Sequence, residues 1–138
     1  MIIDPFNCPV VHPEKKYLDY LASDQYSSNE CQYKVLQNFV SQSPGSISLC
    51  QGPPGTGKSH TILELVKMLV KTGARRILVC TSSNKIIDDM THRLLEHELG
   101  LKYGEIMRIC SQNHEPGEKI KKHSLDQIVN RYLNPKLF

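Results

Sequence analysis

The sequence lacks the residue patterns that mark several classes of protein. Its five cysteines form no C-x-x-C pair and show no metal-ligand spacing. The six histidines are scattered, and His92 and His97 lie five residues apart, which does not place them on one face of a helix. No apolar stretch is long enough to span a membrane, and the chain does not open with a secretory leader pattern. These absences argue against a zinc protein and against a secreted or membrane protein. We therefore expect a soluble protein of the cytoplasm, with the nucleus as the alternative.

Length and bulk composition limit the size of the protein but do not indicate its function. With 138 residues the chain is one domain at most, and it can bury a sizeable core. The net charge of +3 is too small to indicate a polyanionic partner by itself. Cys50, Cys80 and Cys110 each end an apolar run, so we expect them to be small buried hydrophobes in a reducing compartment.

The most informative segment is Gly52-Pro53-Pro54-Gly55-Thr56-Gly57-Lys58-Ser59, which matches the phosphate-binding loop pattern G-x-x-x-x-G-K-[ST]. The glycines allow the backbone to turn its N–H groups toward phosphate oxygens. The lysine adds a cation for the β and γ phosphates, and the serine hydroxyl is a ligand for Mg²⁺. The sequence therefore predicts a nucleotide site, with Lys58 and Ser59 as catalytic residues. Its predicted cofactor-binding residues are Gly52, Pro53, Pro54, Gly55, Thr56, Gly57, Lys58, Ser59 and His60.

The hydrophobic pattern around the loop predicts alternating strands and helices. Strands are expected at 46–51, 76–80 and 105–110, and polar residues at 113–122 predict a loop. Helices are expected at 14–21, at 29–40 behind a cap at Ser27 or Ser28, from about Lys58 to Gly73, at 84–99, and from Ser124 to Tyr132. In the helix after the loop, Ile62, Leu65, Val66 and Leu69 should form the buried face, as should Ile86, Ile87, Met90, Leu94 and Leu95 in the next. This order predicts a three-layer α/β fold with a parallel sheet.

Several separated segments resemble the Upf1-like branch of the superfamily 1 helicases. Residues 29–32 resemble the N-x-x-Q element of that branch, and 51–59 have its form Q-G-P-P-G-T-G-K-[ST]. Residues 78–84, with Asp88 following, are similar to its motif Ia, although Thr81-Ser82 stands where Ala-Pro is usual and Ile86-Ile87 where Ala-Val is usual. Residues 108–110 resemble its next strand. The resemblance covers about 27–110.

The resemblance implies an organisation and roles for individual residues. Residues 1–26 would be an irregular lead-in with a short helix, and 27–138 part of the first RecA-like, P-loop NTPase motor domain. Gln32 would recognise adenine, the loop would hold ATP and Mg²⁺, and the protein would move along single-stranded RNA or DNA. The nucleic-acid contacts would be Thr81, Ser82, Ser83 and Asn84. Without the resemblance, the same residues are better explained as a simple helix cap.

An acidic pair that should follow an apolar strand is absent. Hydrolysis of a nucleoside triphosphate needs carboxylates for Mg²⁺ and for the attacking water. The only adjacent acids, Asp88 and Asp89, lie inside a predicted helix. We therefore expect an incomplete domain without the Walker B strand and the second motor domain, and no useful hydrolysis by the isolated chain. The alternatives are a non-catalytic nucleotide-binding interaction module and another small P-loop NTPase, such as a kinase or an AAA-type module.

Overall fold

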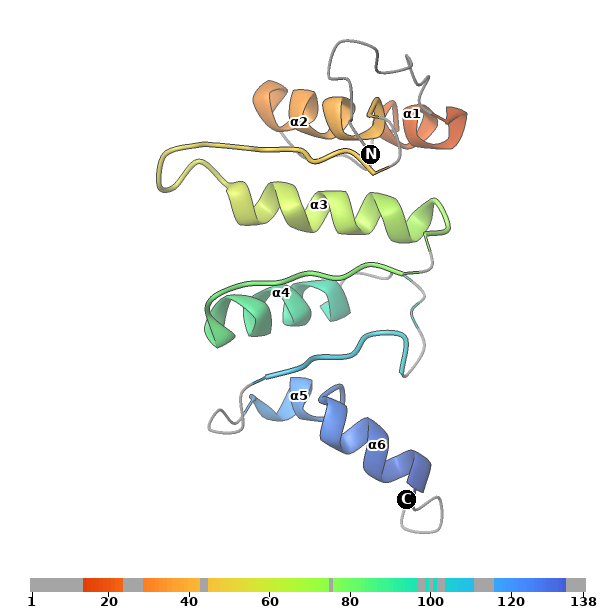
Figure 1. Cartoon of the computed structure of the whole chain (residues 1–138), viewed down its shortest axis with the longest axis vertical. Helices are drawn as coiled ribbons and strands as arrows, with labels where there is room; N and C mark the ends of the chain where they lie inside the picture. The colour runs from red at the N-terminus through yellow and green to blue at the C-terminus, as the bar shows by residue number, and fades with distance from the viewer. Residues whose placement is uncertain are drawn as a thin grey trace, which may run out of the picture. The chain divides into compact units, whose positions relative to one another are not determined.

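The computed structural model describes residues 14–23, 29–42, 45–74, 76–96, 99, 101, 104–110 and 116–133. The chain divides into two compact units, Met1–Arg75 and Arg76–Phe138, and each is described by itself. The described residues form helices joined by extended segments, as Figure 1 shows. In chain order the helices are α1 (Lys15–Leu21), α2 (Glu30–Val40), α3 (Lys58–Lys71), α4 (Asn84–Glu96), α5 (Glu118–Lys121) and α6 (Leu125–Leu133).

The first unit is built on α2, which contacts both α1 and α3. Its core consists of Leu21, Leu36, Val40 and Met68, with aromatic rings and Leu65 packed around them. Each of the three helices contributes to this cluster, because its apolar residues recur at helical spacing. The predictions of helices at 14–21 and 29–40 and from Lys58 are confirmed.

A capping box begins α2. The Asn29 side chain accepts a hydrogen bond from the Gln32 N–H at 3.0 Å, and the Gln32 side chain accepts one from the Asn29 N–H at 3.2 Å. Asn29 is therefore the cap of this helix. Ser27 and Ser28, which we predicted for that position, lie outside the described residues.

The buried face of α3 differs from the prediction. Of the four expected residues, Val66 is buried, Leu65 and Leu69 are half-buried, and Ile62 is 45% exposed. A buried ion pair occupies part of the covered face, with Lys67 Nζ 2.6 Å from Glu64 Oε1. Charged residues can be buried when they satisfy each other, and a search for apolar periodicity does not detect such a pair.

The second unit contains α4, α5 and α6, and α4 contacts α5. On α4, the expected face is confirmed at Met90, which is buried, but Ile86 is 43% exposed. The helix predicted after Ser124 is confirmed as α6, since the Ser124 carbonyl accepts the Ile128 N–H at 3.1 Å. The polar segment predicted as a loop contains the short helix α5, so that prediction is wrong there.

The predicted parallel sheet is wrong for the part of the chain that the structure describes. Residues 46–51 and 76–80 are extended but unpaired, and the β-pairing found is one isolated parallel bridge, Arg108 to Ser124. Side chains that a sheet would cover are exposed, at 85% for Ile47, 95% for Leu49 and 84% for Leu78. An apolar run predicts an extended conformation, but a sheet also needs a neighbouring strand at hydrogen-bonding distance. The three-layer α/β, RecA-like description is therefore replaced by helices linked by extended segments.

The cysteine prediction is wrong for the same reason. Cys50 and Cys80 are exposed and Cys110 is half-buried, and none of the three forms a disulfide. Burial was expected because each ends a run that a sheet would cover on both faces. The runs that end at Cys50 and Cys80 are unpaired, so these two side chains are exposed to solvent.

Candidate functional site

The loop before α3 has the backbone conformation that its glycines predict. Gly55 and Gly57 have φ angles of 79° and 84°, in the left-handed region that favours glycine. Gly57 is the N-cap of α3, and its carbonyl accepts the Thr61 N–H at 2.9 Å. The loop therefore leads directly into the N-terminus of a 14-residue helix, where unpaired N–H groups and the helix dipole favour an anion.

Lys58 folds back over the loop that precedes it. Its Nζ donates hydrogen bonds to the carbonyls of Gly52 and Pro53, both at 2.7 Å. The Thr56 hydroxyl also donates to the Pro53 carbonyl, at 2.9 Å. Two side chains thus close the loop on itself, and the ammonium group contacts its first two residues.

Gln32 connects α2 to the loop. Its Nε2 donates to the Thr56 carbonyl at 3.4 Å, while its Oε1 belongs to the capping box with Asn29. A Cβ atom added at Gly57 would lie 2.6 Å from Gln32 Nε2, so the side chain packs directly on the glycine. The resemblance assigned Gln32 to the adenine, and the structure places it beside the loop.

A pocket of about 400 Å³ lies between α2 and the loop. Five residues that we predicted for the nucleotide line it, whereas Pro54, Gly55, Gly57, Ser59 and His60 do not. The predicted residues in the lining are Gln32, Gly52, Pro53, Thr56 and Lys58. Further lining residues, which sequence reasoning did not assign to the nucleotide, are Asn29, Cys31, Val35, Cys50, Gln51 and Thr61. Two features of the sequence could have pointed to residues of this lining. Val35 lies three positions after Gln32 on the same face of a helix, and Cys50 lies just before the loop.

The residues present fit a bound nucleoside triphosphate. A side chain at Gly52 would crowd the loop, because its Cβ would lie 2.9 Å from Thr56 Oγ1, and the positive φ of Gly57 favours glycine there. Within the described ranges, the Lys58 ammonium donates to loop carbonyls, which phosphate oxygens can replace. Ser59, the predicted Mg²⁺ ligand, is exposed in the first turn of α3.

The four residues predicted to contact nucleic acid lie together just before and at the start of α4. The Thr81 hydroxyl donates to the Ser83 carbonyl at 2.7 Å and accepts the Ser83 N–H at 3.3 Å. The Ser83 carbonyl also accepts the Ile87 N–H at 3.2 Å. Thr81 therefore shapes the loop, while Ser82 is exposed and the helix N-terminus is next to it.

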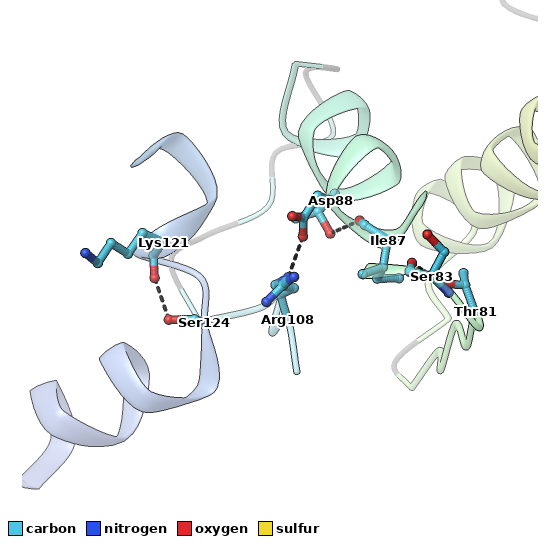
Figure 2. A network of polar contacts seen from close by, with 8 residues as sticks. Thr81, Ser83, Ile87, Asp88, Arg108, Lys121 and Ser124 are labelled. Carbon is cyan, nitrogen blue, oxygen red and sulfur yellow. Dashed lines mark hydrogen bonds and ion pairs between the residues drawn. The ribbon is translucent and has the colours of Figure 1, made fainter. Parts of the chain in front are cut away.

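A buried ion pair lies one turn further along α4. Arg108 Nε is 2.6 Å from Asp88 Oδ1, and the Arg108 side chain is fully buried (Figure 2). Sequence reasoning gave Arg108 no role, although a single arginine inside the apolar run 106–110 was a usable signal. Nearby, burial lowers the pKa of His123, the Lys122 cation lowers it further, and a backbone hydrogen bond with Ile106 opposes both.

Two other features, a metal site and a membrane-spanning helix, are absent from the described residues. There, no group of three or more His, Cys, Asp or Glu side chains could hold a metal ion. None of the helices in the described ranges is long and apolar enough to cross a membrane.

The glycine conformations, the lysine and the following helix match the pattern of a P-loop. Comparison with known proteins extends this result. A family described as the AAA domain matches residues 27–137. The chain belongs to this family, and to its Upf1-like, superfamily 1 helicase branch, as the resemblance predicted.

Several relatives carry informative names. The regulator of nonsense transcripts 1 homolog of Drosophila melanogaster is 41% identical over 95 residues, which are 66% of this chain and 8% of the relative. The DNA polymerase alpha-associated DNA helicase A of Saccharomyces cerevisiae is 37% identical over 89 residues, 62% of this chain and 12% of the relative. The ATP-dependent helicase NAM7 of the same yeast is 38% identical over 86 residues, 62% of this chain and 8% of the relative. The chain thus spans about a tenth of the length of these relatives. No solved structure is significantly similar to it.

Proposed function

We propose that these residues form the ATP-binding part of an ATP-dependent helicase that moves on single-stranded RNA or DNA. The observation that carries this proposal is the junction of α2, the glycine loop and α3, where Gln32 contacts the loop and Lys58 closes it. Membership of a helicase branch supports the same reading.

A separate group of residues would bind each part of the nucleotide. The loop N–H groups and Lys58 would hold the phosphates, and Ser59 would hold Mg²⁺. Gln32 would meet the adenine edge, because an amide can both donate and accept there. When bound, ATP supplies the phosphoanhydride bond whose hydrolysis drives movement. For Lys58 to bind a phosphate, its ammonium must leave the carbonyls of Gly52 and Pro53.

The loop 81–84 would hold the nucleic-acid backbone. Exposed hydroxyl and amide groups at a helix N-terminus can contact phosphates without reading the base sequence. RNA and DNA both offer such contacts, so the proposal includes both kinds of nucleic acid.

Turnover by this chain alone is not expected. The two adjacent acids are both engaged, since Asp88 pairs with Arg108 at 2.6 Å and Asp89 with Arg93 at 3.1 Å. Both acids lie within helix α4 rather than at the end of an apolar strand, where the acids of an NTPase must be. An assay of ATP hydrolysis with and without single-stranded nucleic acid should show no stimulation, and stimulated turnover would contradict this expectation.

The nucleotide site is tested by titrating the chain with a fluorescent ATP analogue in the presence of Mg²⁺. Lys58→Ala should weaken binding by about tenfold or more, since it removes a charge-assisted contact. Lys71→Ala is the matched control, because it removes the same charge at the far end of the same helix. Equal affinities for the two variants and the wild type would refute the proposal.

A further inference from the structure

Among the described residues of the second unit, Arg108 is the largest fully buried side chain, and its burial is chemically unusual. The guanidinium meets Asp88 through Nε alone, at 2.6 Å. Neither Nη1 nor Nη2 has a hydrogen-bond partner within the described part of the chain, although both are buried. Most buried polar groups in proteins are hydrogen-bonded, so this exception needs an explanation.

Stability does not explain why an arginine occupies this position. Removing a guanidinium from water is unfavourable, and one short contact does not satisfy its five N–H donors. A buried ion pair can often be replaced by apolar side chains of similar volume without loss of stability. What the pair adds over such side chains is a fixed distance and direction between two backbone segments.

The two segments that it joins are clear in Figure 2. On one side, the backbone of Arg108 is held by the turn between α5 and α6, because its N–H donates to the His123 carbonyl at 2.8 Å and its carbonyl accepts the Leu125 N–H at 3.0 Å. On the other side, Asp88 follows Ile87, whose N–H donates to the Ser83 carbonyl at 3.2 Å. The ion pair therefore connects a fixed backbone segment to the first turns of α4.

We propose that Arg108 is a positioning residue for the loop 81–84. By holding Asp88, it would fix the start of α4 and with it the groups that face a nucleic-acid backbone. This inference rests on the proposed function of the loop. It adds that the affinity for nucleic acid depends on Arg108, a side chain that does not itself contact the nucleic acid.

The test is the charge-neutral double variant Asp88→Leu with Arg108→Met in the full chain. It removes one positive and one negative charge, so the general attraction to phosphates is unchanged. The matched control, Asp89→Asn with Arg93→Gln, removes the exposed pair on the same helix, whose side chains are 55% and 48% exposed. Both variants and the wild type are compared by thermal unfolding, by ATP-analogue binding, and by anisotropy titration of labelled single-stranded RNA and DNA at several salt concentrations.

The buried-pair variant should unfold at or above the wild-type temperature and bind the ATP analogue normally, but lose about tenfold in nucleic-acid affinity. The slope of log affinity against log salt should not change, because the contacts positioned are uncharged. The control should match the wild type in every measurement. A buried-pair variant that folds and keeps wild-type nucleic-acid affinity would overturn the inference.

Three further variants keep the test decisive. If the double variant does not fold, Asp88→Asn replaces it, since the amide oxygen can still accept from Arg108 Nε; this variant should retain most of the affinity that Asp88→Ala loses. Equal affinities for these two would also overturn the inference.

Ser82→Ala with Asn84→Ala tests the loop itself. If this variant binds nucleic acid as the wild type does, the proposed function of the loop has failed, whereas a loss there without a loss at the ion pair overturns the positioning role alone.

Discussion

Replacing Gly57 by alanine examines the contact between Gln32 and the phosphate loop. An alanine at a φ of 84° is strained by about 1–2 kcal/mol. Its Cβ would also lie 2.6 Å from Gln32 Nε2, which is too close for any stable contact. The glutamine must then move, and it would lose its bond to the Thr56 carbonyl and weaken its bond to the Asn29 N–H.

Gly55 provides the matched comparison. Its φ of 79° gives the same backbone strain, but a Cβ there would meet nothing within 4 Å. We therefore expect Gly55→Ala to lower the free energy of unfolding by about 1–2 kcal/mol. Gly57→Ala should lower it by roughly 2–4 kcal/mol, since one or two exposed hydrogen bonds of about 0.5–1.5 kcal/mol each are added to the strain.

Urea unfolding followed by circular dichroism measures these differences. Repeating both substitutions in a Gln32→Ala background isolates the contact, because the collision disappears with the glutamine side chain. In that background the two glycine variants should differ by less than about 0.5 kcal/mol. If the glycine variants are equal with Gln32 present, or still differ as much without it, the proposed packing of Gln32 on the loop is wrong.

Three other outcomes follow from single side chains. Leu36→Ala should destabilise the chain by about 2–5 kcal/mol in the same unfolding assay, because this residue is fully buried between the helices of the first unit, and a loss below 1 kcal/mol would contradict that packing. Asn29→Ala should cost about 1 kcal/mol by removing the cap of α2, measured as helix content and unfolding midpoint; an unchanged midpoint would argue against the capping box. Burial lowers the pKa of His123 in the folded state, so the unfolded state takes up a proton at a higher pH than the folded state does. The free energy of unfolding should therefore fall as the pH drops below about 6.5. Unfolding at a series of pH values should show a weaker dependence in His123→Gln, and identical slopes would exclude this histidine as the cause.

Helix positions were predictable because their causes are local. Periodic apolar residues, the glycine before Lys58 and the polar residues before α6 each act within a few positions of the chain. The capping role of Asn29 was missed because two serines nearby are equally good capping residues. The buried Glu64–Lys67 pair was missed because charged residues at helical spacing usually face solvent.

The sequence by itself determined the phosphate-loop motif and the family, since both reside in consecutive residues with fixed chemical demands. Only the tertiary structure decided which extended segments pair, because pairing depends on a neighbour that no local pattern specifies. It likewise decided that Gln32 packs on Gly57 from 25 residues away, and that Arg108 is buried against Asp88 at a separation of 20. Contacts between distant residues depend on how helices pack, so they could be read only from the folded chain.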